Sequence, residues 1–583
     1  MTSRFAIGET DFLLDGAPHR IISGAVHYPR VHPELWRDRI RKARLMGLNA
    51  IETYVAWNAH EPVRGQWRAD GDVDLGRFLD IIADEGMHAI VRPGPYVCAE
   101  WHNGGLPTWL TSMQGVRLRS SDPVYLAEVS AYLEKVNAII APRQIDQGGS
   151  VILVQIENEY GAYGFDKGYL DELVRVTRAA GITIPLTQVD QPIPHMLENG
   201  AHPELHKTGS FGSRIDERLA TLREHQPSGP LMCMEFWCGW FDHWGEKHHT
   251  TAFADSAADL DRLLAAGASV NIYMVHGGTN FGLTAGANDS GRYLPMVTSY
   301  DYDAPISESG DLTEKFHAFR EVISKHAPVP DLPPTDPVCA PTPHAVLEAV
   351  LNPLDLVATD RGEFAAPPTM DELGADVVLA EYVTAVAGSG VLEAEVRDHA
   401  WVDRDGTPAG RLQRTSGDLS IVVPPGRALR LLVEETGRVN YDTKIGETKG
   451  LIGSPLLDGE ELPGPWHVRT FDVPALGRAV SDATGSVAVP TGRASGPVGL
   501  RADIDLAEPA DLFLDTSGWG KGYAWVNDFF LGRYWRRGPQ RTLYVPGPAT
   551  RAGRNRVVIV ELEAVTDATV RFLPRPDLGH EVE

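Results

Sequence analysis

Cysteine is scarce in this sequence, with four residues among 583: Cys98, Cys233, Cys238 and Cys339. So few cysteines exclude a disulfide-stapled scaffold and favour free thiols in a reducing compartment. Long apolar runs are also missing, because no stretch approaches the ~20 residues that cross a bilayer. The N-terminus lacks the basic and apolar segments of a signal peptide. We therefore expect a cytoplasmic protein with no membrane partner.

Positive charge is in deficit as well. The chain has 53 Lys and Arg residues against 79 Asp and Glu residues, which gives a formal net charge of −26. A surface this acidic repels phosphate backbones and anionic lipids, so we expect no nucleic-acid partner. The charge balance is typical of a protein that acts on a neutral molecule.

Over residues 1–327, short apolar runs alternate with amphipathic stretches, which is the pattern of a parallel sheet with crossover helices. The predicted strands are 20–27, 48–56, 88–93, 150–157, 183–189, a weak one at 207–211, 230–236 and 269–276. Helical patterns lie between them at 36–46, 75–85, 124–140, 169–180, 215–225 and 253–266. Eight strands that alternate with helices predict a (β/α)8 TIM barrel.

The pattern changes after residue 327. Residues 328–364 contain the Pro-rich stretch VPDLPPTDPVCAPTP and are predicted to be a linker or a wrap along the barrel. Beyond them, short alternating runs at 376–384, 419–423, 428–433, 511–515 and 556–562 are separated by Gly, Pro and Asp. These runs predict two small all-β domains of the sandwich or jelly-roll type, over 365–455 and 456–583. The expected fold class is multidomain, α/β followed by all-β.

Acidic residues directly follow two of the predicted barrel strands. Glu157 and Glu159 come after the apolar run VILVQI, and Glu235 follows PLMCM. Because side chains alternate along a strand, Glu157 and Glu159 are predicted to point the same way unless the strand kinks. An acid at the end of a buried strand costs desolvation unless it is paired or used. A strand end that meets solvent, or a salt bridge at the barrel rim, would also explain each acid singly.

These acids follow the fourth and seventh predicted strands, whose ends face each other across the mouth where barrel enzymes place catalytic groups. Glycoside hydrolysis needs two such carboxyls, one to protonate the leaving oxygen and one to stabilise or attack the oxocarbenium-like centre. Residues of other loops are candidates to bind the sugar: Tyr54, Glu100, Tyr300 and Tyr302. Each of these four, taken singly, is more typical of a packing residue.

Six ordered motifs resemble those of glycoside hydrolase family 35. They are ETYVAWNAHEP, RPGPYVCAEWHNGGLPTWL, VQIENEYG, EFWCGWFDHWG, HGGTNFG and TSYDYDAPISESGDLTEKF, and they cover the predicted barrel. The likeness extends to GRVNYDTKIGETKGLIG (437–453) and GWGKGYAWVNDFFLGRYW (518–535), the second of which is similar to the family's galactose-binding-like jelly roll. The resemblance implies a retaining exo-β-galactosidase that acts on terminal β-D-galactosyl residues of an oligosaccharide, by double displacement and with no cofactor.

The resemblance also implies roles for individual residues. Glu159 matches the general acid/base and Glu235 the nucleophile, while Glu157 is left as a structural residue. The implied galactose subsite consists of Tyr54, Cys98, Ala99, Glu100, Asn158 and Tyr302, walled by Trp240, and we add Tyr300 from its loop. No metal site is expected, because His243, His248 and His249 have no acid or Cys partner at a convincing spacing.

Two places depart from the animal members of the family. Trp237 stands where they often carry Tyr, and Leu283 and Thr284 follow HGGTNFG where aromatics are common. Both places are expected near the rim of the subsite, so leaving-group preference stays open. An exo-β-glucosaminidase on the same scaffold and a non-catalytic carbohydrate-binding protein are the alternatives, and the β-rich region leaves a homodimer open.

Overall fold

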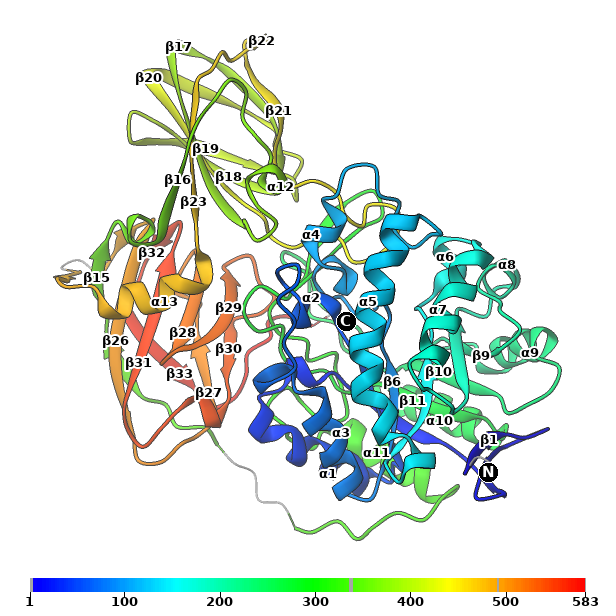
Figure 1. The fold of residues 1–583 in the computed structure, drawn as a ribbon. Helices are drawn as coiled ribbons and strands as arrows, with labels where there is room; N and C mark the ends of the chain where they lie inside the picture. Colours follow the sequence, from blue (N-terminus) through cyan, green and yellow to red (C-terminus); the bar gives the residue numbers. More distant parts are fainter. Residues whose placement is uncertain (1–3, 335–338, 490–491, 582–583) are drawn as a thin grey trace.

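The computed structural model describes residues 4–334, 339–489 and 492–581. Figure 1 shows one helix-rich body, coloured blue to green, beside two bodies built mainly of strands. Eight parallel strands close into a barrel in the order β10-β11-β4-β5-β6-β7-β8-β9. Their bounds are β4 (Ile22–Val26), β5 (Ala50–Tyr54), β6 (His88–Arg92), β7 (Val151–Gln155), β8 (Leu186–Asp190), β9 (Leu205–Ser210), β10 (Met232–Trp237) and β11 (Ser269–His276). Every predicted barrel strand overlaps one of these, the weak sixth one included, so the predicted barrel is confirmed.

The outer layer of the barrel consists of the helices that lie between these strands in the sequence. They include α1 (Trp36–Met46), α3 (Leu75–Asp84), α5 (Pro123–Ile140), α7 (Lys167–Ala179), α9 (Ile215–His225), α10 (Phe253–Ala265) and, after the last strand, α11 (Glu314–Ser324). The Asp122 and Asp166 side chains accept backbone N–H bonds in the first turns of α5 and α7, and Gly47 ends α1 at a φ of 108°. No helix in the described part of the chain is long and apolar enough to cross a membrane.

The middle domain is a sheet in the order β16-β23-β17-β20-β18-β19. Its strands are β16 (Ala358–Phe364), β17 (Leu379–Arg397), β18 (His399–Arg404), β19 (Thr407–Gln413), β20 (Ser420–Glu434) and β23 (Trp466–Phe471), with β21 (Gly450–Leu457) paired to β17. Strand β20 joins two runs that were predicted as separate strands. The predicted boundary near residue 455 is wrong, because β23 pairs with both β16 and β17 and so belongs to this domain.

The C-terminal domain contains two large sheets, with strand orders β14-β33-β27-β30 and β24-β15-β26-β31-β28-β29, and a small pair formed by β25 (Ala494–Ser495) and β32 (Ala564–Val565). Two of its strands, β14 (His344–Val346) and β15 (Glu348–Leu351), come from the segment predicted as a linker. The others are β24 (Val487–Ala488), β26 (Val498–Leu506), β27 (Leu512–Asp515), β28 (Lys521–Val526), β29 (Phe529–Trp535), β30 (Thr542–Val545), β31 (Gly553–Glu561) and β33 (Thr569–Leu573).

The interpretation of 328–364 as a linker is therefore wrong for its second half. β14 pairs with β33, β15 with β26, and β16 with β23 of the middle domain. The physical reason is that Leu347 and Ala349 are buried in the C-terminal core, a signal too short to stand out beside the Pro-rich stretch. Residues 335–338 of that stretch lie outside the described residues. The chain thus visits the C-terminal domain before it builds the middle one.

Candidate active site

A cavity of about 420 Å³ lies at the carboxyl ends of the barrel strands, where barrel enzymes place their chemistry. Nine of the residues predicted from the sequence line it: Tyr54, Cys98, Ala99, Glu100, Asn158, Glu159, Glu235, Trp240 and Tyr302. Tyr300 lies behind this wall, since its hydroxyl donates to Glu100 Oε2 at 2.5 Å and the Arg30 guanidinium covers its ring at 3.7 Å. Tyr300 therefore supports Glu100 and is not part of the lining.

The chain turns sharply after β7, and this turn separates Glu157 from Glu159. Both residues have left-handed backbone, with φ of 59° and 44°, a conformation that costs about 1–3 kcal/mol per residue and clusters at functional sites. Glu157 is buried against Arg119, with Nε and Nη2 at 3.0 and 2.7 Å, and accepts from the Tyr169 hydroxyl at 2.7 Å. Glu159 lines the cavity instead. The prediction that the two side chains point the same way is wrong because the strand has already ended at Gln155.

Glu235, on β10, is surrounded by hydrogen-bond donors. Arg92 Nη2 lies 2.7 Å from its Oε1, and the Tyr54 hydroxyl lies 2.8 Å from the same atom. Ser210 Oγ and Trp237 Nε1 donate to Oε2 at 2.9 and 3.2 Å. Of these four donors the sequence predicted only Tyr54 as a site residue. The others lie at or next to strand ends, and that position is the one signal that could have found them.

The electrostatic settings of Glu235 and Glu159 differ in sign. Burial by itself raises the pKa of Glu235, but the charge of Arg92 and the hydrogen bonds from Tyr54, Arg92 and Trp237 outweigh it and hold that pKa below its usual value. Burial, together with the negative charges of Glu235 and Asp190, raises the pKa of Glu159 to about 8. Near neutral pH the site therefore holds one ionised carboxylate and one protonated carboxylic acid.

Asn158 and Glu100 complete the polar floor. Asn158 Oδ1 accepts from Arg92 Nη2 at 2.6 Å and lies 2.7 Å from the Tyr54 hydroxyl, and its amide N–H groups are left to a ligand. Burial raises the pKa of Glu100 to about 7, although the Tyr300 hydroxyl and Arg30 act against this rise. The adjacent Cys98 and Ala99 are left-handed like Glu100, so the loop turns these three residues toward the cavity.

The outer part of the lining, apart from Trp237, was not predicted. It consists of Gln191, Trp237, Phe241, His243, Tyr273, Asn288, Ser290, Arg292, Leu294 and Tyr441. Tyr441 follows β20, so it reaches the barrel mouth from the middle domain. Trp237 was expected near the rim and does line the cavity, but Leu283 and Thr284 line a separate cavity between the barrel and the middle domain. The expected rim position of these two residues is therefore wrong.

The histidines near the mouth have partners other than a metal ion. His248 Nδ1 and His249 Nδ1 lie 2.6 and 3.0 Å from the carboxylate oxygens of Asp242, an acid partner that sequence spacing did not reveal. His243 Nε2 lies 2.9 Å from Asn288 Oδ1. Across residues 4–334, 339–489 and 492–581, no three His, Cys, Asp or Glu side chains are grouped so that they could hold a metal.

Comparison with known proteins identifies the family of this barrel. The model of the family described as "Glycosyl hydrolases family 35" matches residues 11–326. This chain belongs to glycosyl hydrolase family 35. Two further family models match the all-β part of the chain. They are "Beta-galactosidase, first all-beta domain" over 367–472 and "Beta-galactosidase, galactose-binding domain" over 497–555. The resemblance drawn from the motifs is confirmed, and so is the barrel followed by two all-β domains.

Curated relatives match the family 35 chain over nearly its full length. The Beta-galactosidase-1-like protein of Mus musculus is 39% identical over 601 residues, which is 97% of this chain and 91% of the relative. The Beta-galactosidase of Bos taurus is 40% identical over 612 residues, 97% of this chain and 92% of its own length. That of Homo sapiens is 39% identical over 616 residues, 98% and 90% of the two chains.

Proposed function

We propose that this family 35 member is a retaining exo-β-galactosidase that hydrolyses terminal non-reducing β-D-galactosyl residues. One observation carries the proposal: Glu159 and Glu235 line the same cavity, with Arg92 against Glu235 and no cation of the described residues in contact with Glu159. This arrangement favours an ionised Glu235 and a protonated Glu159, the charge states that double displacement requires. The sugar is inferred from the names of the relatives, Beta-galactosidase and Beta-galactosidase-1-like protein. The match covers 90% or more of each relative's length. The alternative of an exo-β-glucosaminidase keeps the same chemistry with another sugar.

The proposed reaction has two steps. Glu235 attacks the anomeric carbon and forms a glycosyl ester while Glu159 gives its proton to the departing oxygen. Esterification removes the negative charge of Glu235 and with it part of the cause that raises the pKa of Glu159. Glu159 then takes a proton from a water that attacks the anomeric carbon, which releases the sugar with its configuration retained. Oε1 of Glu159 has no hydrogen-bond partner among the described residues, so it is available to the leaving oxygen.

The location and assembly of the enzyme are part of the same proposal. All four cysteines, Cys339 on the surface among them, are free thiols, which supports a reducing compartment such as the cytoplasm. The substrate is a neutral oligosaccharide, in keeping with the acidic chain. A homodimer stays a prediction, and gel filtration with light scattering tests it.

A panel of 4-nitrophenyl glycosides tests the sugar specificity. We expect kcat/KM for the β-galactoside to exceed that for the β-glucoside, the β-glucosaminide and the α-galactoside by about 100-fold or more, since a site built to hydrogen-bond one set of hydroxyls rejects its epimers strongly. Preference for the β-glucosaminide would replace galactose while it leaves both glutamates in their roles. No hydrolysis of any glycoside would contradict the proposal as a whole.

Single substitutions test the two roles. Glu235→Ala should lower kcat for every substrate by about 10³-fold or more, because no covalent intermediate forms.

Glu159→Ala should slow the hydrolysis of lactose, whose leaving group needs a proton, by about 10²- to 10⁴-fold. It should slow the first step with 4-nitrophenyl galactoside far less. The basic limb of kcat/KM for lactose should fall as pH rises through about 8 in the wild type, because Glu159 then loses its proton. A larger effect at Glu157 than at Glu159 would contradict the assignment.

A further inference from the structure

A β-hairpin of the barrel separates the cavity from the middle domain. Its strands, β12 (Ala287–Asp289) and β13 (Tyr293–Pro295), are antiparallel, with Asn288 opposite Leu294 and Asp289 opposite Tyr293. Since side chains alternate along each strand, the hairpin has two distinct faces. One face, with Asn288, Ser290, Arg292 and Leu294, lines the outer part of the cavity. The other face, with Ala287, Asp289 and Tyr293, is buried.

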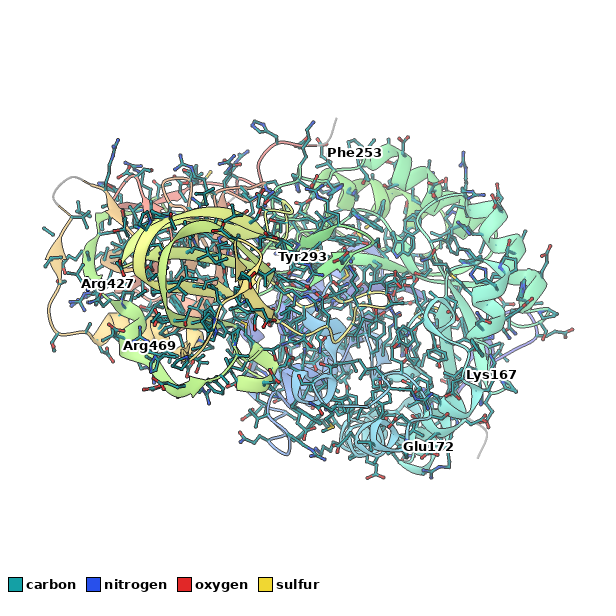
Figure 2. All side chains as sticks on the ribbon, turned by 90° about the horizontal axis from the view of Figure 1, so that it is seen from above. Lys167, Glu172, Phe253, Tyr293, Arg427 and Arg469 are labelled. Atoms are coloured by element: carbon teal, nitrogen blue, oxygen red, sulfur yellow. The ribbon has the colours of Figure 1, made fainter. Side chains whose placement is uncertain are left out.

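The buried face is held by charges of the middle domain. Asp289 lies between Arg414 Nη2 at 2.7 Å and Lys444 Nζ at 2.8 Å. The guanidinium of Arg414 and the ammonium of Lys449 lie over the Tyr293 ring, at 4.4 and 4.6 Å from its centre. Figure 2 labels Tyr293 where the yellow-green middle domain meets the barrel.

Backbone contacts continue the same attachment. Segment 438–440 of the middle domain runs beside β12, where Ala287 N donates to Arg438 O at 3.0 Å and Asn440 N donates to Ala287 O at 2.9 Å. The Tyr293 hydroxyl lies 2.6 Å from Gly437 O and 2.8 Å from Asp398 Oδ2. The middle domain thus supplies a third strand-like segment to the hairpin and fixes its position.

The cavity face of the hairpin offers hydrogen-bonding groups beyond the two catalytic glutamates. Asn288 is oriented by His243, whose Nε2 lies 2.9 Å from its Oδ1, so the amide N–H groups are left to a ligand. Glu246 Oε1 holds Arg292 Nη2 at 2.9 Å at the rim, and the guanidinium keeps other N–H groups. Together with the Ser290 hydroxyl, these groups match the hydroxyls of a second sugar.

We propose that the cavity face of the β12–β13 hairpin is the subsite for the leaving-group sugar, and that the Asp289–Arg414 contact with the middle domain positions it. This inference rests on the proposed β-galactosidase function and adds the residues that select what galactose is attached to. Asn288, Ser290 and Arg292 bind the leaving sugar. Asp289 and Tyr293 act through the hairpin and are positioning residues.

Comparing disaccharides with an aryl galactoside tests the subsite. For both substrate types kcat/KM reports the step in which the galactosyl group moves to Glu235, and only the disaccharide has a sugar to occupy the subsite. For Arg292→Ala and Asp289→Asn, the loss of kcat/KM with β-1,3- and β-1,4-galactosyl disaccharides should exceed the loss with 4-nitrophenyl β-galactoside by about tenfold, the effect of one charged hydrogen bond.

The matched control is Arg430→Met, which removes a middle-domain arginine away from the hairpin. Arg430 is ion-paired with Glu381 and Asp403. This variant should keep the wild-type ratio of disaccharide to aryl-galactoside activity. Equal losses with both substrate types, or wild-type ratios in both hairpin variants, would overturn the subsite. If Asp289→Asn does not fold, Arg292→Ala on the exposed tip of the hairpin still tests the subsite. A wild type without activity on aryl β-galactosides would instead overturn the proposed function.

Discussion

Glu157 and Glu159 lie two residues apart, and their surroundings give them opposite energetic roles. Glu157 is neutralised in the interior by the guanidinium of Arg119, so its charge is part of a complete ion pair. Glu159 is buried without a cation in contact, beside the negative charges of Glu235 and Asp190. A buried, unpaired carboxyl destabilises the folded state once it ionises, whereas removal of one partner of a buried pair leaves the other uncompensated.

The stability of two isosteric variants separates these roles. Glu157→Gln should lower the Tm, because the loss of one partner of a buried pair costs about 3–5 kcal/mol. Glu159→Gln should raise the Tm. The folded-state pKa of Glu159, about 8, is above its ordinary value of 4.5. The free energy of unfolding of the wild type therefore falls as pH rises from 4.5 to about 8, because Glu159 ionises more readily in the unfolded chain. The stability that Glu159→Gln gains over the wild type grows across the same pH range. Calorimetry at pH 5 and pH 8 measures both, and a stabilising Glu157→Gln would contradict the ion-pair role.

Among the elements, the strands of the barrel were the easiest to predict. β7 is apolar up to its last residue, as parallel strands covered on both faces tend to be, and β11 is mostly apolar, whereas β9 reads LHKTGS and gives almost no signal. From the local pattern alone, the site was predictable only where an acid interrupts such a run, as at Glu235, and the other predicted lining residues came from the family resemblance. Nothing in the local pattern distinguishes Glu157 from Glu159, because the turn after Gln155 depends on what each side chain meets in three dimensions. Tyr441 reaches the cavity through packing of the middle domain, which no local pattern encodes.

The end of strand β6 places a buried cation, Arg92, against the nucleophile candidate Glu235. Arg92 is fully buried and lies 2.7 Å from Glu235. Since Arg92 favours the ionised form of Glu235, Arg92→Met should raise the pKa of that carboxyl. In the proposed mechanism Glu235 must be ionised to attack, so the acid limb of kcat/KM, where activity is lost as pH falls, should move upward by the same amount.

Arg119→Met is the matched control for this shift. It removes another buried arginine, ion-paired with Glu157 and absent from the cavity lining. Both variants should lose stability, since each leaves a buried carboxylate unpaired, but only Arg92→Met should move the acid limb. The acid limb is measured from pH 3 to 9 with 4-nitrophenyl β-galactoside. If it does not move in Arg92→Met, Arg92 does not control the pKa of Glu235.

At the scale of the whole molecule, the two all-β domains are joined by a shared interior. Leu379 and Leu432 of the middle domain pack in one apolar cluster with Trp525 and Val558 of the C-terminal domain. The segment after the barrel enters the C-terminal domain at once, because β14 pairs with β33 and β15 with β26. Thr298 Oγ1 of the barrel donates to the C-terminal Arg533 O at 2.6 Å, which adds a direct contact. Because the middle domain fixes the hairpin at the cavity, the rigidity of these junctions bears on the active site.

An ion pair buried at the junction of the two all-β domains gives this rigidity a test. Lys521 of β28 contacts Glu434 at the end of β20, and the Tyr523 hydroxyl donates to the same carboxylate at 2.7 Å. Lys521→Met should destabilise the protein by about 3–5 kcal/mol, because it leaves Glu434 buried with an incomplete set of partners. Arg175→Met, which breaks an exposed pair with Glu172 on α7, should leave the Tm unchanged, since such pairs are screened by solvent. Thermal unfolding of both variants beside the wild type measures the difference. A Tm in Lys521→Met equal to that of Arg175→Met would mean that the two domains are held by their apolar contacts alone.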